Sequence, residues 1–129
     1  MLKVYLVIMA GGALGSAGRF ALSLWILERF GDGFPLGTLA VNLTGSFLIG
    51  LIYGLTAPDG LFPEPPLARE FLILGVLGGF TTFSTFSLQT LHLLQAGHWG
   101  LASINIIGSV TLCLLAAWFG WGLATLLSR

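Results

Sequence analysis

The chain has 129 residues, of which 56% are hydrophobic and only 8% are charged, and its mean hydropathy is +0.97. A soluble domain carries roughly 25% charged residues, so this chain has too few charges to cover a surface that faces water. Its net charge at pH 7 is zero, which argues against a nucleic-acid partner. The composition therefore predicts an all-α integral membrane protein whose surface mostly contacts the lipid bilayer.

Charged and turn-forming residues divide the chain into four apolar stretches, each long enough for the roughly 20 residues that a helix needs to cross a membrane. We expect these spans at about 5–27, 36–57, 71–94 and 99–127, within a single transmembrane domain, 1–129. The first stretch is interrupted by Gly11, Gly12 and Gly15 and continues past Arg19. It is therefore interpreted as a span and not as a cleaved signal peptide. The sequence predicts a multi-pass protein of the cell membrane.

The first span contains a positive charge, Arg19, and no expected span contains an Asp or Glu that could neutralise it. A cation in mid-membrane costs at least a few kcal/mol unless it is paired or hydrated. Arg19 can bond to backbone carbonyls, extend to the interface, or provide a positive potential that favours anions. The lack of an intramembrane carboxylate argues against a proton-coupled transporter such as a small multidrug exporter.

The second and fourth spans each carry polar residues at a spacing of four, which places them on one helix face. They are Thr38, Asn42 and Ser46 in the second span, and Asn105 and Ser109 in the fourth. The Asn42 amide offers two N–H donors to an anion. Hydrogen bonding between helices is the alternative role of these side chains, and Ser109 can also bond to its own helix.

The third span combines a weak helix-forming sequence with a cluster of polar residues. Gly78 and Gly79 are followed by β-branched and hydroxyl residues, which disfavour a helix interior. In lipid, a broken helix is tolerated only where it is buried in protein or lines a cavity. We therefore expect this span to break near the two glycines, close to its centre, and to expose N–H groups for an anion and carbonyls for a cation. Such a break argues against a scaffold without transport function.

Hydroxyl and aromatic side chains follow this expected break. The hydroxyls belong to Thr81, Thr82, Ser84 and Thr85. Phe83 and Phe86 lie three residues apart and so share a helix face. The edge of a phenyl ring is electropositive, so two ring edges can coordinate a small, hard anion. The alternative interpretation is that the two rings only fill space between helices.

The charges outside the spans specify orientation weakly. With four spans, the termini and the middle loop share one side of the membrane, and that side carries Lys3, Arg69 and Arg129. Arg29 lies on the other side. This small bias leaves two possibilities open: termini in the cytoplasm, or a dual topology in which copies insert in both directions.

Three motifs, spread along the chain in the expected order, resemble the signature of the Fluc (CrcB) family of fluoride channels. They are GGALG at 11–15 followed by Arg19 and Phe20, GTLAVN at 37–42 followed by GSF at 45–47, and GGFTTFSTF at 78–86. The resemblance covers essentially the whole chain. It implies a passive fluoride channel, not an enzyme, that exports fluoride and lowers its cytoplasmic concentration.

The resemblance also implies an antiparallel, dual-topology homodimer with two fluoride pores lined by Asn42, Phe83 and Phe86. Ser109 matches a serine on the pore side of the family's fourth span. A structural Na⁺ at the dimer centre is implied as well, held by the backbone carbonyls of Gly78 and Thr81 from both subunits. Four residues before this serine the family often has Tyr, where this chain has Asn105.

Overall fold

A computed structural model describes residues 1–63 and 65–129 of the chain. Within these residues the structure is helical, and four stretches are long and apolar enough to cross a membrane. They are Leu2–Phe30, Leu36–Leu55, Pro66–Gln95 and Trp99–Leu127. The protein is thus a multi-pass membrane protein, as the sequence predicts. The first and third stretches are longer than the expected spans, because a helix can continue into the headgroup layer, where charged residues such as Glu28 and Arg29 are hydrated. The second stretch ends two residues earlier than expected, and the fourth has the expected bounds.

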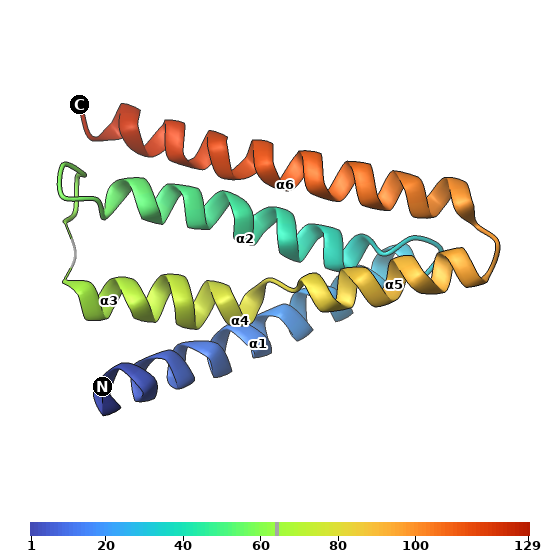
Figure 1. The fold of residues 1–129 in the computed structure, drawn as a ribbon, viewed down its shortest axis with the longest axis horizontal. Coiled ribbons are helices and arrows are strands. Elements are labelled where there is room, and N and C mark those ends of the chain that lie inside the picture. Colours follow the sequence, from blue (N-terminus) through green and yellow to red (C-terminus); the bar gives the residue numbers. More distant parts are fainter. Residues whose placement is uncertain (64) are drawn as a thin grey trace.

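The helical elements follow one another up and down (Figure 1). They are α1 (Leu2–Phe30), α2 (Leu36–Leu55), α3 (Pro66–Glu70), the π-helical η1 (Phe71–Leu77), α4 (Gly78–Phe80), α5 (Phe83–Gln95) and α6 (Trp99–Leu127). In Figure 1, α2 and α6 run side by side in the same direction, while the segment from α3 to α5 runs the other way as one interrupted rod. Both termini lie at the same end of the molecule as the connection between α2 and α3.

Glycines allow the helices to approach one another closely. In α6, the carbonyl oxygen of Ala117 occupies the place where a Cβ on Gly50 of α2 would sit. Likewise, a Cβ on Gly79 of α4 would lie 2.6 Å from the carbonyl oxygen of Gly12 in α1. Small residues let helix backbones meet in this way in membranes, where no hydrophobic force drives helices together.

The third span breaks near its centre at Thr81 and Thr82, just after the glycine pair. The backbone of Thr81 is extended, with φ −78° and ψ 156°, and so is that of Thr82, with φ −152° and ψ 118°. Gly78 keeps helical angles, φ −63° and ψ −35°. The expected position is therefore shifted by a few residues. Gly79 allows the close contact with α1. The helix ends after it, at Thr81 and Thr82, where side chains replace the backbone hydrogen bonds that the break removes.

Candidate functional site

The amide of Asn42 bonds to both backbone groups of Thr82 at the break. Its Oδ1 accepts a hydrogen bond from the Thr82 N–H at 2.7 Å, and its Nδ2 donates to the Thr82 carbonyl at 2.9 Å. An unsatisfied backbone group would be costly in lipid, and this pair of bonds removes that cost for Thr82. One of the two N–H donors of Asn42 is used here, which leaves the second for another acceptor.

The break also removes the helical donors of the carbonyls just before it, among them those of Gly78 and Thr81. In a continuous helix, Gly78 would accept from the Thr82 N–H and Thr81 from the Thr85 N–H. The Thr82 N–H bonds instead to Asn42 Oδ1, and the Thr85 N–H bonds to Thr82 Oγ1 at 3.2 Å. The Gly78 and Thr81 oxygens are therefore available to other partners.

One of these partners is Arg19 of α1. Its Nη1 donates to the Thr81 carbonyl at 3.2 Å, so the intramembrane guanidinium bonds to the break itself. Of the options that the sequence leaves open, the structure places Arg19 on a backbone carbonyl. The positive charge lies beside the break in either role.

Thr82 is the N-cap of α5 and organises the hydroxyls after it. Its Oγ1 accepts from the Thr85 N–H, as a threonine cap normally does. The same atom lies 3.1 Å from Thr85 Oγ1 and 3.3 Å from Ser84 Oγ. The candidate residues Ser84 and Thr85 thus form one hydroxyl cluster at the start of α5. From the sequence, Thr82 is expected only as one hydroxyl among several, and its role as the cap of α5 is missed. The signal for it is a threonine three residues before another polar residue, which is a recognisable capping pattern.

The rings of Phe83 and Phe86 contact each other on α5. Their centroids are 5.3 Å apart and their planes are tilted by 47°, as in many aromatic pairs. Phe86 is buried, with 8% of its surface exposed, whereas Phe83 is 74% exposed in the isolated chain. Phe86 is therefore fixed by packing within the chain, whereas Phe83 is largely exposed.

Ser109 and Asn105 lie in a buried network between α5 and α6, apart from the Asn42 pair. Ser109 Oγ donates to Asn105 Oδ1 at 3.2 Å, and Asn105 Nδ2 donates to Thr90 Oγ1 at 2.9 Å. Thr90 Oγ1 in turn donates to the Phe86 carbonyl at 2.8 Å. The network reaches the backbone of Phe86, so Asn105 has a structural role between α5 and α6.

A groove of about 440 Å³ brings four of the nine candidate site residues together, namely Asn42, Gly78, Thr81 and Phe83. The other five do not line it: Arg19, Ser84, Thr85, Phe86 and Ser109. It is lined by residues of α2, η1, α4, α5 and α6 and by the break, among them Asn42, Ser46, Gly78, Thr81, Thr82, Phe83 and Cys113. Polar groups of the break thus line an open groove on the surface of the molecule.

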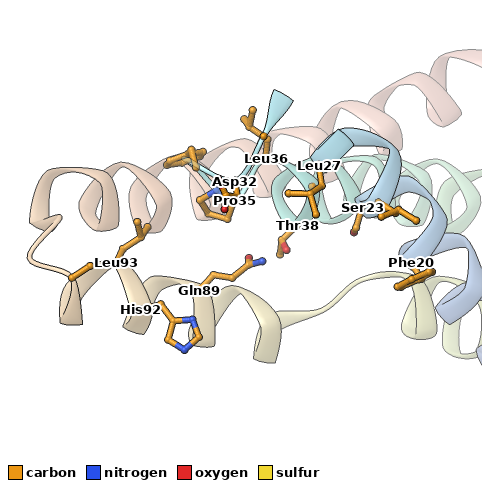
Figure 2. A pocket seen from close by; sticks show the side chains of 15 residues that line it. Phe20, Ser23, Leu27, Asp32, Pro35, Leu36, Thr38, Gln89, His92 and Leu93 are labelled. Carbon is orange, nitrogen blue, oxygen red and sulfur yellow. The ribbon is translucent and has the colours of Figure 1, made fainter. Parts of the chain in front are cut away.

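A second cavity, of about 410 Å³, lies at the end of the molecule opposite the termini (Figure 2). Its walls include Thr38 of α2 and Gln89 and His92 of α5, and Figure 2 shows the Gln89 side chain extending toward Thr38. Gln89 Oε1 is buried and has no hydrogen-bond partner within the described part of the chain. Gln89 is absent from the sequence-based candidates, although it stands three residues after Phe86, on the same helix face.

The polar stripe on α2 connects these two hollows. Thr38 lines the cavity, while Asn42 and Ser46 line the groove. Successive turns of one helix therefore carry polar groups from an end of the molecule to the break.

The profile of the family described as "CrcB-like protein, Camphor Resistance (CrcB)" matches residues 6–121. The chain belongs to the CrcB family. Similar proteins occur in several bacteria, and each of the following is named a fluoride-specific ion channel FluC. One from Opitutus terrae is 56% identical over 92% of this chain and 90% of its own length. One from Paramagnetospirillum magneticum is 47% identical over 97% and 98%, and one from Thermus thermophilus is 50% identical over 92% and 91%. This CrcB-family chain is accordingly classed with ion channels and not with enzymes.

Proposed function

We propose that the chain forms a passive, fluoride-selective channel that exports fluoride and lowers its concentration in the cytoplasm. The observation that carries the proposal is the break at Thr81 and Thr82, near the centre of the third span, where hydroxyl groups, the Asn42 amide and the Phe83 ring line a groove. Relatives named fluoride channels support the identity of the ion. Fluoride in the cytoplasm is negatively charged, so the membrane potential suffices to drive it outward.

Fluoride is small and strongly hydrated, so a pore must replace the water that the ion loses. The free N–H of Asn42, the hydroxyls of Ser84 and Thr85, and the edges of Phe83 and Phe86 are donors of the required kind. Several weak donors suit a channel better than one strong site, because an ion that binds too tightly does not leave. We assign Ser109 to the pore side of α6, where its bond to Asn105 would orient its hydroxyl.

The proposal includes an antiparallel homodimer with two pores. In the isolated chain, Asn42, Ser46 and the break face an open groove, and Phe83 is largely exposed. Backbone polar groups are tolerated at this depth only when they are covered by protein or line a watery path. A second copy packed against this face would cover the groove and enclose a pore beside each break.

The proposal also includes a structural Na⁺ at the dimer centre, bound by Gly78 and Thr81 of both subunits. The donor set fits, because both carbonyls have lost their helical partners and hard cations prefer oxygen ligands. The Thr81 oxygen already accepts from Arg19, but a carbonyl oxygen has a second lone pair for a cation. The ion would supply positive charge that holds the two breaks together.

The test is ion efflux from proteoliposomes that contain the purified protein. With a potassium ionophore to balance charge, we expect rapid fluoride efflux and little chloride efflux. Equal efflux of the two anions would contradict the selectivity. No efflux of either anion from correctly assembled protein would contradict the channel itself.

A further inference from the structure

A third hollow, of about 500 Å³, lies where α2 ends and α3 begins, on the side of the termini. Because the second span ends at Leu55 and the third begins at Pro66, this level corresponds to the headgroup layer of the bilayer. The lining is polar at Thr56, Arg69 and Glu70, and apolar at Ile73 and Leu74, which lie further along the third span. The hollow is thus polar at the level of the headgroups and apolar toward the membrane interior, as a lipid molecule is.

Arg69 is held in this hollow by an aromatic ring. Its guanidinium carbon lies 4.8 Å from the centroid of the Tyr53 ring, in a cation–π contact. Its Nε is buried and has no hydrogen-bond partner within the described residues. A guanidinium presents five N–H donors in a planar fork that matches the oxygens of a phosphate. The Tyr53 ring holds the guanidinium in the hollow, so its terminal N–H groups are suited to bind a phosphate group.

The second charge in the hollow narrows the choice of ligand. Glu70 follows Arg69 and lines the same space. A simple anion would be attracted by Arg69 and repelled by Glu70. A zwitterion with a phosphate and a primary ammonium offers each residue a group of opposite charge.

From this combination we infer that the hollow binds the headgroup of an aminophospholipid. The phosphate bonds to Arg69, the ammonium bonds to Glu70, and an acyl chain runs inward past Ile73 and Leu74. Ile73 and Leu74 also line the groove at the break, so the acyl chain would lie at the rim of that groove, beside the second copy of the chain. This inference is independent of fluoride conduction.

The test is native mass spectrometry of the purified full-length protein with added lipids. The probes are phosphatidylethanolamine, phosphatidylcholine, phosphatidylglycerol and diacylglycerol with identical acyl chains. We expect phosphatidylethanolamine to bind most tightly.

Arg69→Gln should weaken the binding of phosphatidylethanolamine about tenfold, as expected for one lost charge-assisted contact. Glu70→Gln should lower it to the level of phosphatidylcholine. Arg129→Gln is the matched control, because Arg129 does not line the hollow, and it should leave lipid binding unchanged.

Several results would overturn the inference. One is equal binding of phosphatidylethanolamine and diacylglycerol to the unmodified protein, a comparison that needs no variant to fold. Another is unchanged lipid binding in Arg69→Gln, with fluoride efflux used to confirm that this variant assembles. Phosphatidylglycerol binding as tight as that of phosphatidylethanolamine would refute the role of Glu70. Full competition by glycerophosphoethanolamine, which has no acyl chains, would show a site for a soluble phosphate ester instead.

Discussion

At the scale of single residues, the break depends on a side chain that both donates and accepts. Asn42 bonds to the N–H and to the carbonyl of Thr82, so it replaces two backbone hydrogen bonds from one position. Among side chains of this length, only a carboxamide can do this at neutral pH. Asn42 therefore has a structural role in addition to the role in the pore that we propose.

Asn42→Asp is expected to abolish fluoride efflux, lowering it about 100-fold or more, equivalent to a barrier increase of roughly 3 kcal/mol. Asp has nearly the same volume but places a negative charge beside the ion path and cannot donate to the Thr82 carbonyl. Efflux from proteoliposomes is the measurement, and Thr44→Val, at an exposed neighbouring position, is the control. Normal efflux in Asn42→Asp would remove this residue from the pore.

The two phenylalanines provide a test of the ring edges. Phe83→Ile and Phe86→Ile keep apolar bulk but lose the polarised edge, and each should lower fluoride efflux about tenfold. Phe86→Ile should also cost about 1 kcal/mol of stability, because Phe86 is buried. Phe119→Ile is the control, since that ring pairs with Phe47 at 6.1 Å, away from the break. If both α5 variants conduct normally, the rings only pack.

At the scale of helices, the sequence predicts the break in the third span better than its position. The weak helix formers from Gly78 onward indicate a break near the centre, which the structure confirms. The exact residues depend on partners from other helices, Asn42 of α2 and Arg19 of α1, and on the contact of Gly79 with Gly12. No pattern local to the third span contains this information.

Gly50→Ala should destabilise the packing of α2 on α6. The added Cβ would collide with the backbone of Ala117, at an expected cost of about 1–3 kcal/mol. Gly122→Ala on α6 is the matched control, because nothing lies within 4 Å of its added Cβ. Both changes raise helix propensity by about 1 kcal/mol, so their difference isolates the collision. Thermal unfolding in detergent should show a lower midpoint for Gly50→Ala alone; equal midpoints would contradict the close approach.

At the scale of the whole molecule, composition and charge spacing predict the four spans, because lipid permits few alternatives to an apolar helix. The candidate site is less predictable. The spacing of Asn42, Phe83 and the hydroxyls indicates polar groups at the break, and the structure brings these together. It does not indicate that Asn105, which accepts a hydrogen bond from Ser109, bonds to Thr90 of another helix, because spacing along one helix does not reveal its neighbours.

Dual topology is the first prediction for the assembly. A reporter fused to the C-terminus should give a signal from both sides of the membrane, because the charge bias between the two sides is small. Adding two or three lysines to one loop should shift insertion toward one orientation. A signal from a single side in the unmodified protein would refute dual topology and, with it, the antiparallel dimer.

Removal of Na⁺ is the second prediction for the assembly. After long equilibration in Na⁺-free buffer with a large organic cation, the dimer should dissociate more readily and fluoride efflux should fall. The carbonyls of Gly78 and Thr81 would then lack a cation that satisfies them. Restoring Na⁺ should reverse both changes. Dimer stability and efflux that do not respond to Na⁺ would contradict the site.

The start of α5 at Phe83 has an electrostatic consequence. A helix carries roughly half a positive elementary charge at its N-terminus, where the first N–H groups lack helical partners. In a continuous span this charge would lie at the membrane surface, where water and salt screen it. Here the break places it near the centre of the third span, beside Asn42 and the hydroxyl cluster. Peptide dipoles do not titrate, so this attraction for anions persists at every pH at which the protein stays folded.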